Sequence, residues 1–317
     1  MKNILVAGGC GFIGSNFIRR NIANNKIICI DNFLTGSKDN LRSIANHSNL
    51  SIKEIDIIDE FSIDESLDYI VNFACAGSPP KYQIDPIHTI KTNTIGVDNL
   101  LSLALKNNAV FFQSSTSEVY GNPTHSPQNE NYLGNVNCFG DRACYDEGKR
   151  LAETLCLEYL RKYDVDVRIA RIFNTYGPYM DPFDGRVITN FLSQVIQKKP
   201  LTVYGMGEQT RSFCYIDDLL DGIENLIFNV RSNDLNSPIN IGNPKEFTIN
   251  ELIQEISTIF NIKPNITFQD LPMDDPLQRK PDIEKAKKLL DFNPKLDWKT
   301  GLTKTHNYIK SILWQKF

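Results

Sequence analysis

The chain has 317 residues, of which 41% are hydrophobic and 23% charged, and its formal net charge is −4. This composition is typical of a globular protein; it offers no basic surface for nucleic acid and no Lys/Arg run for a membrane surface. The 7 Cys and 4 His residues are scattered, which predicts reduced thiols and no metal site.

Predicted strands and helices alternate through the first half of the chain. Short apolar runs typical of buried parallel strands precede stretches with helical periodicity. The predicted strands are residues 2–7, 26–30, 51–55, 69–73, 110–114 and 167–172, and the predicted helices include 96–106 and 145–163. This alternation predicts an α/β fold with a Rossmann-type doubly wound parallel sheet. Because the first strand begins at residue 2 and no apolar run reaches membrane-spanning length, we expect no signal peptide and a cytoplasmic location.

From about Asn174 the sequence changes to loops rich in Pro, Gly and aromatic residues, interrupted by helices. The predicted helices are 186–197, 216–228, 249–260 and 283–290, and residues 238–241 are predicted to return a strand to the main sheet. We therefore expect residues 1–173 to form a dinucleotide-binding domain, with a returning segment near 238–245. Residues 174–317 are expected to form a smaller, mixed α/β substrate-binding domain interleaved with it.

The first predicted strand runs directly into Gly8-Gly9-Cys10-Gly11-Phe12-Ile13-Gly14. Gly8 permits a tight turn, Gly11 lets the backbone approach a pyrophosphate, and Gly14 lets a helix pack against the strand. The amide groups of Phe12 and Ile13, at the helix start, would face the phosphates. A glycine triplet alone is weak evidence, but this one lies between a strand and a helix, so it predicts a dinucleotide site.

Acidic residues follow the second and third strands. Asp31, followed by Asn32, stands where a carboxylate accepts hydrogen bonds from the adenosine ribose hydroxyls. A carboxylate there repels a 2′-phosphate, so NAD is favoured over NADP. Asp56 and Ile57 are predicted to contact the adenine; the alternative for each aspartate is a solvated loop position.

Tyr145 and Lys149 are predicted to share one face of a helix, about a turn apart. A cation there holds the phenol near its phenolate form, which makes Tyr145 a proton acceptor at neutral pH. Thr116 ends a predicted strand with its hydroxyl at the same place. Such a trio removes a proton from a sugar hydroxyl while a nicotinamide takes the hydride. The alternative is an amphipathic helix with a chance Tyr and Lys, which the upstream dinucleotide site disfavours.

With these residues, the chain resembles the extended short-chain dehydrogenase/reductase family, and within it the UDP-glucuronate decarboxylases (UDP-xylose synthases). The likeness spans nearly the whole chain. The segments that carry it are residues 76–82, 92–96, 115–121, 142–150, 170–178, 184–187, 209–215 and 279–283. The chain departs from the family pattern at Asn72, at Ser37-Lys38 and at Gln278.

The resemblance implies an NAD-dependent conversion of UDP-glucuronate to UDP-xylose. Its C4 hydroxyl would be oxidised, carbon dioxide would leave the 4-keto intermediate, and the hydride would return to C4. Tyr145, helped by Thr116, would take the C4 hydroxyl proton, while Lys149 tunes Tyr145 and holds the nicotinamide ribose. The resemblance implies that Glu118 positions the sugar or a water for protonation of C5, and that Arg279 lies near the carboxylate or helps to deliver the proton.

Ser117 and Glu118 separate relatives that share the fold. A 4,6-dehydratase needs an acid, usually Asp, at the position of Ser117, whose hydroxyl is too weak an acid. Uronate 4-epimerases generally lack Glu118. Epimerisation of a UDP-uronate and release of the 4-keto pentose stay open as alternatives. A non-catalytic NAD-sensing protein is disfavoured, since such proteins commonly lose the catalytic Tyr or Lys.

The resemblance also implies a UDP-sugar site and a homodimer. The predicted substrate residues are Pro79, Lys81, Tyr82, Asn174, Arg186, Val187, Tyr204, Arg211 and Arg279. A guanidinium matches a diphosphate, and an aromatic ring stacks on uracil; the alternatives are a surface salt bridge for Arg186 and a packing role for Tyr204. Ser78, Pro79 and Pro80 are expected to shape a loop over the sugar carboxylate; the alternative is that they only end a helix. The dimer would form through a four-helix bundle of helices 96–106 and 145–163, unless one chain covers their apolar faces.

Overall fold

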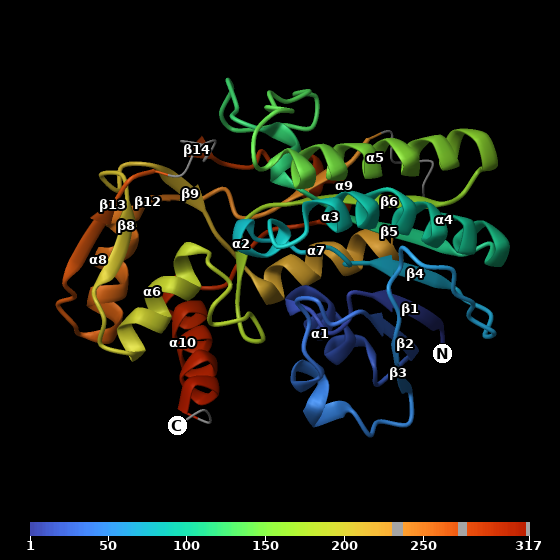
Figure 1. Cartoon of the computed structure of the whole chain (residues 1–317), viewed down its shortest axis with the longest axis horizontal. Coiled ribbons are helices and arrows are strands. Elements are labelled where there is room, and N and C mark those ends of the chain that lie inside the picture. Colours follow the sequence, from blue (N-terminus) through green and yellow to red (C-terminus); the bar gives the residue numbers. More distant parts are fainter. Residues whose placement is uncertain (230–236, 272–277, 315–317) are drawn as a thin grey trace.

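The structure is a computed structural model that describes residues 1–229, 237–271 and 278–314. Its largest sheet has seven parallel strands in the order β11-β6-β5-β4-β1-β2-β3 (Figure 1). These strands are β1 (Asn3–Ala7), β2 (Lys26–Asp31), β3 (Leu50–Glu54), β4 (Tyr69–Asn72), β5 (Val110–Thr116), β6 (Val167–Ile172) and β11 (Ile239–Ile241). The chain leaves β1 in one direction and returns to its other side at β4, which confirms the predicted doubly wound α/β fold.

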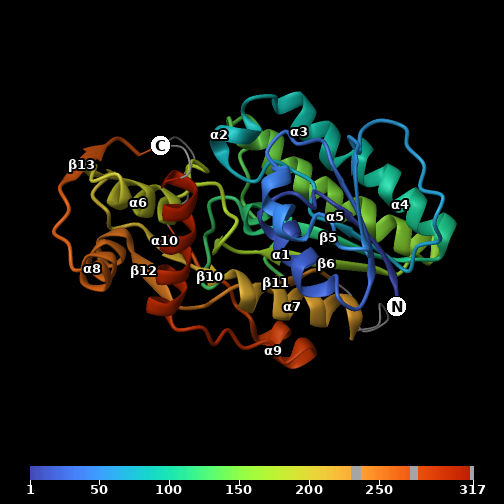
Figure 2. The same cartoon turned by 90° about the horizontal axis from the view of Figure 1, so that it is seen from below.

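Two apolar layers cover the main sheet, because successive side chains of a strand point to opposite faces. The covering helices are α1 (Phe12–Asn21), α3 (Pro86–Asn93), α4 (Ile95–Asn107), α5 (Ala143–Tyr163) and α7 (Ile216–Phe228). Val6 and Phe112 pack in the layer with α1 and α7, whereas their neighbours Leu5 and Phe111 pack in the layer with α4 and α5. Figure 2 shows α1 and α7 on one side of the sheet and α3, α4 and α5 on the other.

The later residues add a smaller region beside the carboxyl ends of the main strands (Figure 1). Its helices are α6 (Val187–Ile196), α8 (Ile249–Phe260) and α10 (Trp298–Trp314), whereas α9 (Glu284–Leu290) packs against β11 and α7 of the main sheet. Its short strands are β7 (Thr175–Tyr176), β8 (Leu201–Tyr204), β9 (Thr210–Ser212), β10 (Cys214–Tyr215), β12 (Glu246–Thr248), β13 (Ile266–Gln269) and β14 (Gln278–Arg279). These strands form three small sheets, β10-β7, β12-β9-β14 and β13-β8.

The predicted strands of the main sheet are all present, and β11 pairs with β6, which confirms the return of a strand at 238–241. The helix α10 and the small sheets were not predicted. The buried face of α10 includes Gly301 and Thr305 beside Leu302 and Ile309, so the apolar period is interrupted. The boundary at residue 173 stays a prediction. Within the described ranges, no helix combines the length and apolarity needed to cross a membrane.

Gln128 ties the loop after β5 to the strand that carries Arg279. Its side chain is fully buried, and its backbone NH donates to Lys280 O at 2.8 Å. The NH groups of Lys280 and Asp282 donate in turn to the side-chain and backbone oxygens of Gln128, at 2.9 and 2.8 Å. These bonds hold Arg279, far along the chain, next to the residues at the end of β5.

Candidate active site

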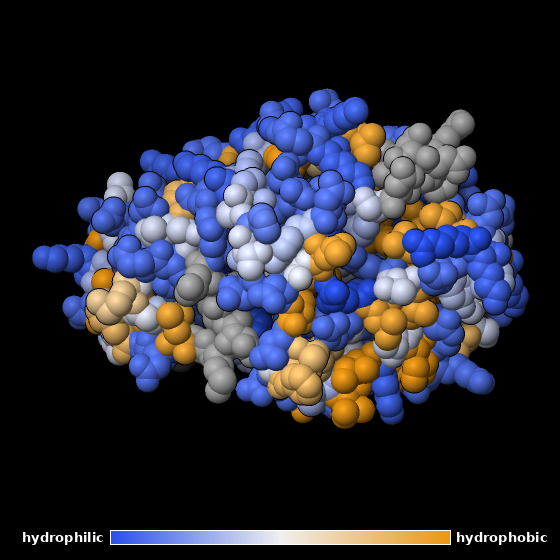
Figure 3. All heavy atoms as spheres, turned by 90° about the horizontal axis from the view of Figure 1, so that it is seen from above, coloured by the Kyte–Doolittle hydropathy of each residue, from blue (hydrophilic) through white to orange (hydrophobic). Residues whose placement is uncertain are grey.

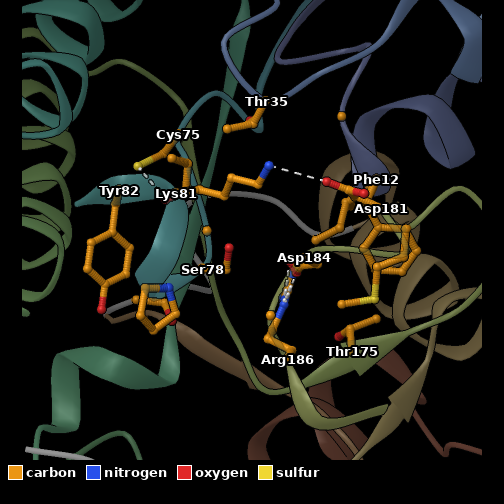
Figure 4. Close-up of a pocket in the computed structure, with 18 of the residues that line it drawn as sticks. Phe12, Thr35, Cys75, Ser78, Lys81, Tyr82, Thr175, Asp181, Asp184 and Arg186 are labelled. Atoms are coloured by element: carbon orange, nitrogen blue, oxygen red, sulfur yellow. Dashed lines mark hydrogen bonds and ion pairs between the residues drawn. The ribbon is translucent and has the colours of Figure 1, made fainter. Parts of the chain in front are cut away.

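A cavity of about 1010 Å³ lies at the carboxyl ends of the main-sheet strands, where α/β proteins place their ligands. Every residue that the sequence assigned to cofactor, substrate or chemistry lines this cavity. Figure 4 shows part of it, with Phe12 on one wall and Cys75, Lys81 and Tyr82 on the opposite one. The geometry therefore brings the predicted residues together; their individual roles stay predictions.

The turn between β1 and α1 forms one end of the cavity. Gly8 has φ of +70°, and a Cβ there would come within 2.7 Å of the Ala74 nitrogen, so only glycine suits the turn. A Cβ on Gly14 would collide with the Gly8 carbonyl oxygen. The helix α1 begins after Gly11 without a side-chain cap, so amide donors of Phe12 and Ile13 are available to an anionic ligand.

Asp31 ends β2 beside this turn. One of its carboxylate oxygens accepts a hydrogen bond from Cys10 N at 2.9 Å and the other from Phe33 N at 2.8 Å. Burial raises the pKa of Asp31, although both backbone bonds oppose the rise. A Cβ on Gly36 would lie 2.8 Å from both oxygens, so the following loop packs tightly over the carboxylate.

Asp56 belongs to a hydrogen-bonded group at the same end. It accepts from Asn32 Nδ2 at 2.8 Å, and His88 Nε2 lies 2.7 Å from the same oxygen. Burial alone would raise the pKa of Asp56, but Asn32 and His88 outweigh it, so the pKa is lowered. Ile57 follows in the cavity wall. His88 was not singled out in the sequence; it lies on α3, and nothing in its spacing indicates that Asp56, just after β3, is its partner.

Tyr145 and Lys149 lie together on α5, as their spacing predicts. Both are buried, and the Lys149 Nζ lies 5.8 Å from the centre of the Tyr145 ring and donates to Ser114 O at 2.9 Å. Thr116, at the end of β5, accepts from Glu118 N at 3.2 Å. The proximity of these residues supplies the trio that the sequence indicated.

The ionisation of Tyr145 differs from the expectation. Burial raises the pKa of Tyr145 and the nearby Cys75 adds to the rise, while a hydrogen bond with Thr116 lowers it. Burial also lowers the pKa of Lys149. In the protein alone, Lys149 therefore does not bring the phenol to its phenolate form, because desolvation outweighs the neighbouring ammonium group.

Glu118 is held by two guanidinium groups. Arg142 Nη2 lies 2.5 Å and Arg279 Nη2 lies 3.2 Å from the same Glu118 oxygen. Arg279 is 1% exposed, also donates to Ser117 O at 2.8 Å, and has an Nε with no partner among the described residues. Burial alone would raise the pKa of Glu118, but Arg279, Arg142 and Arg211 outweigh it and lower it, so Glu118 is ionised.

Helix α2 (Pro79–Tyr82) and the loop before α6 face each other across the cavity. Lys81, on α2, points toward Asp181, and its Nζ forms an ion pair with Asp181 Oδ2 at 3.3 Å (Figure 4). The Tyr82 ring stacks on Tyr145 with centroids 5.0 Å apart and an interplanar angle of 6°. Arg186 makes a bidentate pair with the buried Asp184. Lys81 and Arg186 thus have protein partners, which substrate contacts would have to share or replace.

The remaining predicted substrate residues line the wall beyond these loops. They are Asn174, Val187, Tyr204 and Arg211. Tyr204 is 38% exposed, which favours an available aromatic face over a packing role. Arg211 donates to Thr210 O at 2.8 Å and is largely buried.

Sequence reasoning missed Arg142 and Tyr308. Arg142 stands in the quoted segment 142–150, and only the folded chain shows that it pairs with Glu118. Tyr308 lies on α10, reaches the cavity and donates to Asn40 Oδ1 at 3.4 Å. Because that helix was not predicted, no signal pointed to it. Of the departures from the family pattern, Asn72 is buried and bonds to Gln113 at 2.9 Å, which gives it a structural role.

Comparison with known proteins adds independent findings. Residues 4–242 match the NAD dependent epimerase/dehydratase family. UDP-glucuronic acid decarboxylase 1 of Arabidopsis thaliana is 47% identical over 300 residues, covering 94% of this chain and 68% of that protein. UDP-glucuronic acid decarboxylase 1 of Danio rerio is 45% identical over 313 residues, covering 98% and 73%.

Solved structures share the fold over nearly the whole chain. A UDP-N-acetylglucosamine 4-epimerase from Methanobrevibacter ruminantium, in complex with UDP-N-acetylmuramic acid, has a TM-score of 0.89 at 28% identity and covers 98% of this chain and 99% of its own. A UDP-glucuronic acid 4-epimerase from Bacillus cereus, in complex with UDP-glucuronic acid and NAD, has a TM-score of 0.87 at 27% identity with the same coverage. On its sequence match and its fold, the chain belongs to the NAD dependent epimerase/dehydratase family.

Proposed function

We propose that this chain is an NAD-dependent UDP-glucuronate decarboxylase that forms UDP-xylose and carbon dioxide. The observation that carries the proposal is Glu118, ionised and held by Arg142 and Arg279 in the cavity that Tyr145 lines. The relatives named UDP-glucuronic acid decarboxylase, identical at 45–47% of aligned positions, support the same reaction.

The nucleotide end of the cavity fits NAD. The uncapped start of α1 suits a pyrophosphate, and the Asp31 oxygens, with one backbone NH each, keep lone pairs for ribose hydroxyls. Asn32, Asp56 and Ile57 form the wall proposed for the adenine. Bound there, NAD would take a hydride from C4 of the sugar and later return it.

Tyr145 and Thr116 are proposed to move the proton of the C4 hydroxyl; Tyr145 would accept it as a phenolate, which the positive charge of bound NAD together with Lys149 would favour over the phenol of the ligand-free protein. The hydrogen bond between Tyr145 and Thr116 lowers the pKa of Tyr145, and it orients the phenol while the proton leaves the sugar. Lys149, fixed by its bond to Ser114 O, is proposed to hold the nicotinamide ribose. When hydride returns to C4, Tyr145 gives the proton back.

Loss of carbon dioxide needs little further machinery. Oxidation of C4 makes a β-keto acid, whose C5–carboxylate bond breaks readily because the ketone delocalises the resulting electron pair. Arg279 lines the cavity and its Nε has no partner among the residues that the structure describes; it is proposed to orient the carboxylate. Ser117 supplies no acid, so dehydration is disfavoured.

The UDP group is assigned to the far wall of the cavity. Arg211, Arg186 and Asn174 are proposed to bind the diphosphate and ribose, with Tyr204 stacking on the uracil and Val187 packing beside it. Pro79, Lys81 and Tyr82 are proposed to close over the sugar. Arg186 would share its guanidinium between Asp184 and the ligand.

Other reactions on the same fold remain as candidates. The 4-epimerases among the structural neighbours favour a UDP-uronate 4-epimerase as the second candidate, and a decarboxylase that releases the 4-keto pentose would use the same first steps. Glu118 with its two arginines favours decarboxylation. A non-catalytic NAD sensor is disfavoured because Tyr145 and Lys149 lie together in the cavity.

The test is an NMR time course of the purified protein with UDP-glucuronate, first without and then with added NAD. UDP-xylose and carbon dioxide without net NADH would support the full cycle. A 4-keto pentose with matching NADH would mean that the last reduction fails, and UDP-galacturonate would mean epimerisation. No conversion would contradict the proposal.

We further propose that the protein forms a homodimer through α4 and α5. Large apolar side chains stay exposed on these helices and on α3: Ile87, Ile90, Ile95, Leu105 and Leu151. Figure 3 shows hydrophobic atoms gathered on the part of the surface where these helices lie. One chain does not cover these side chains, so a second copy is the favoured partner. Light scattering should show a dimer, and Leu151→Asp should dissociate it, while Phe139→Asp at an exposed loop position should not.

A further inference from the structure

Asp146 follows Tyr145 on α5 and is a buried acid. Its side chain is 6% exposed, and its Oδ1 has no partner among the described residues. Buried carboxylates in folded proteins are paired or hydrogen-bonded, because an uncompensated charge in such a place is strongly unfavourable. An acid left in this state is therefore expected to keep its proton.

The cations near Asp146 are already engaged. Arg142 and Arg279 share one oxygen of Glu118, at 2.5 and 3.2 Å. The charged and titratable groups in electrostatic range of Asp146 include Glu118 just after β5, Arg142 just before α5, Cys144 and Glu147 on α5, Arg279 on β14 and Tyr82 on α2. Burial first, and then the charge of Glu118, raise the pKa of Asp146 to about 7 against the pull of the two arginines.

The proposed reaction needs a proton that Glu118 cannot itself hold at rest. Once carbon dioxide has left, C5 must receive a proton before hydride returns to C4. Glu118 lies beside the reacting groups, but Arg279 and Arg142 keep it ionised. Asp146 interacts electrostatically with Glu118, and its pKa of about 7 lets it hold a proton up to neutral pH.

Building on the proposed decarboxylation, we propose that Asp146 stores the proton destined for C5 and supplies it through Glu118. Asp146 first gives its proton to Glu118 and becomes a carboxylate. The electron pair of the broken C5–carboxylate bond, spread over C5, C4 and the 4-oxygen, forms the new C5–H bond with that proton, and Glu118 returns to its carboxylate form. Asp146 then takes a proton from solvent before the next turnover. Asp146 is not among the described residues that line the cavity, so it is a positioning residue that acts through Glu118.

The test compares Asp146→Asn with Glu147→Gln, the next residue, whose partly exposed carboxylate pairs with Arg150 at 3.3 Å. In the wild type, kcat should fall as the pH rises through about 7, where Asp146 loses its proton. Asp146→Asn should lower kcat by at least about tenfold and remove that part of the profile. Its solvent isotope effect in D₂O should rise, because proton delivery to C5 becomes limiting. Asp146→Glu should restore part of the rate, and Glu147→Gln should behave as the wild type.

Infrared difference spectra separate this inference from the reaction itself. Ligand-free wild-type protein should show the carbonyl stretch of a protonated carboxyl at neutral pH, and Asp146→Asn should lack it. Absence of that band in the wild type, or an Asn variant with the wild-type pH profile and isotope effect, would overturn the inference while leaving decarboxylation intact. A wild type inactive on UDP-glucuronate would overturn the proposed function and the transfer to C5, with the band still reporting whether Asp146 holds a proton.

Discussion

Two buried carboxylates on the same helix, Glu153 and Asp146, meet opposite surroundings. Glu153 accepts from Ser115 Oγ at 2.5 Å and from Arg171 at 2.9 and 2.7 Å, whereas the Asp146 Oδ1 has no donor among the described residues. Their exposed fractions, 7% and 6%, are nearly equal. Burial alone therefore does not determine whether a buried acid is ionised; its hydrogen-bond and ion-pair partners do.

The group around Glu153 is complete. Arg171 also donates to Tyr120 Oη at 3.0 Å, and that hydroxyl donates to Asn240 Oδ1 at 2.7 Å, which joins α5, β6 and β11. Burial raises the pKa of Tyr120 to about 12, so this hydroxyl stays protonated at physiological pH. A network of this kind fixes the sheet. Around Asp146, one carboxyl oxygen has no partner among the described residues, which suits a proton that must move.

The largest effect is expected on kcat, for a substitution of Tyr145 in the cavity. Tyr145→Phe keeps the ring that stacks on Tyr82 but removes the proton acceptor, so kcat should fall by about 10²–10⁴-fold. NAD binding, measured by fluorescence titration, should stay near the wild-type value. Turnover close to that of the wild type would remove Tyr145 from the mechanism.

Glu153→Gln should lower the stability of the fold without changing the rate of the reaction. It leaves the guanidinium of Arg171 buried without its counter-charge, so the free energy of unfolding should fall by about 3–5 kcal/mol. Urea denaturation measures this loss, and kcat per folded molecule should be unchanged. Glu158→Gln is the matched control, because it breaks an exposed pair with Arg161 on the same helix and should cost less than about 1 kcal/mol.

Asp146→Asn should stabilise the protein as the pH rises, in contrast to the loss of stability expected for Glu153→Gln. The folded-state pKa of Asp146, about 7, lies above its ordinary value of 3.8. The stability tied to this proton is therefore complete below the ordinary value and is lost as pH rises through about 7. Relative to the wild type, the variant should gain about 2–3 kcal/mol in free energy of unfolding between about pH 5 and about pH 8. Parallel curves for the two proteins would show that Asp146 is already ionised.

Asp31 is intermediate between Glu153 and Asp146 in its hydrogen bonding, and its substitution should give the smallest effect of those predicted. Both of its oxygens have a backbone donor, yet burial still raises its pKa. Asp31→Ala should weaken NAD binding by about tenfold, since one ribose hydrogen bond is lost. Calorimetric titration should show UDP-glucuronate binding unchanged; equal loss of both ligands would mean that the fold was damaged.

The sequence predicts those parts of the site that depend on local pattern. The glycine turn, Asp31 and Thr116 follow predicted strands, and the carboxyl ends of parallel strands meet at one edge of the sheet. Tyr145 and Lys149 need only the helical repeat. These residues therefore fall in one cavity, as expected from their order alone.

What depends on tertiary contacts could not be predicted in this way. Arg142 has no local feature that marks it as the partner of Glu118, and the raised pKa of Asp146 results from burial against elements far apart in the chain. Spacing alone suggested that Lys149 would ionise Tyr145. A sequence pattern carries no information about desolvation, so it could not show that burial raises the pKa of Tyr145.

The bonds of Gln128 to Lys280 and Asp282 have a consequence for engineering. Glu118 comes from one half of the chain and Arg279 from the other, and the buried amide fixes their register. A chimera that joins the first half of this protein to the second half of a relative would need a matching glutamine and a matching return strand. The two halves are therefore not interchangeable modules, and substrate preference cannot be transplanted by exchanging the later residues alone.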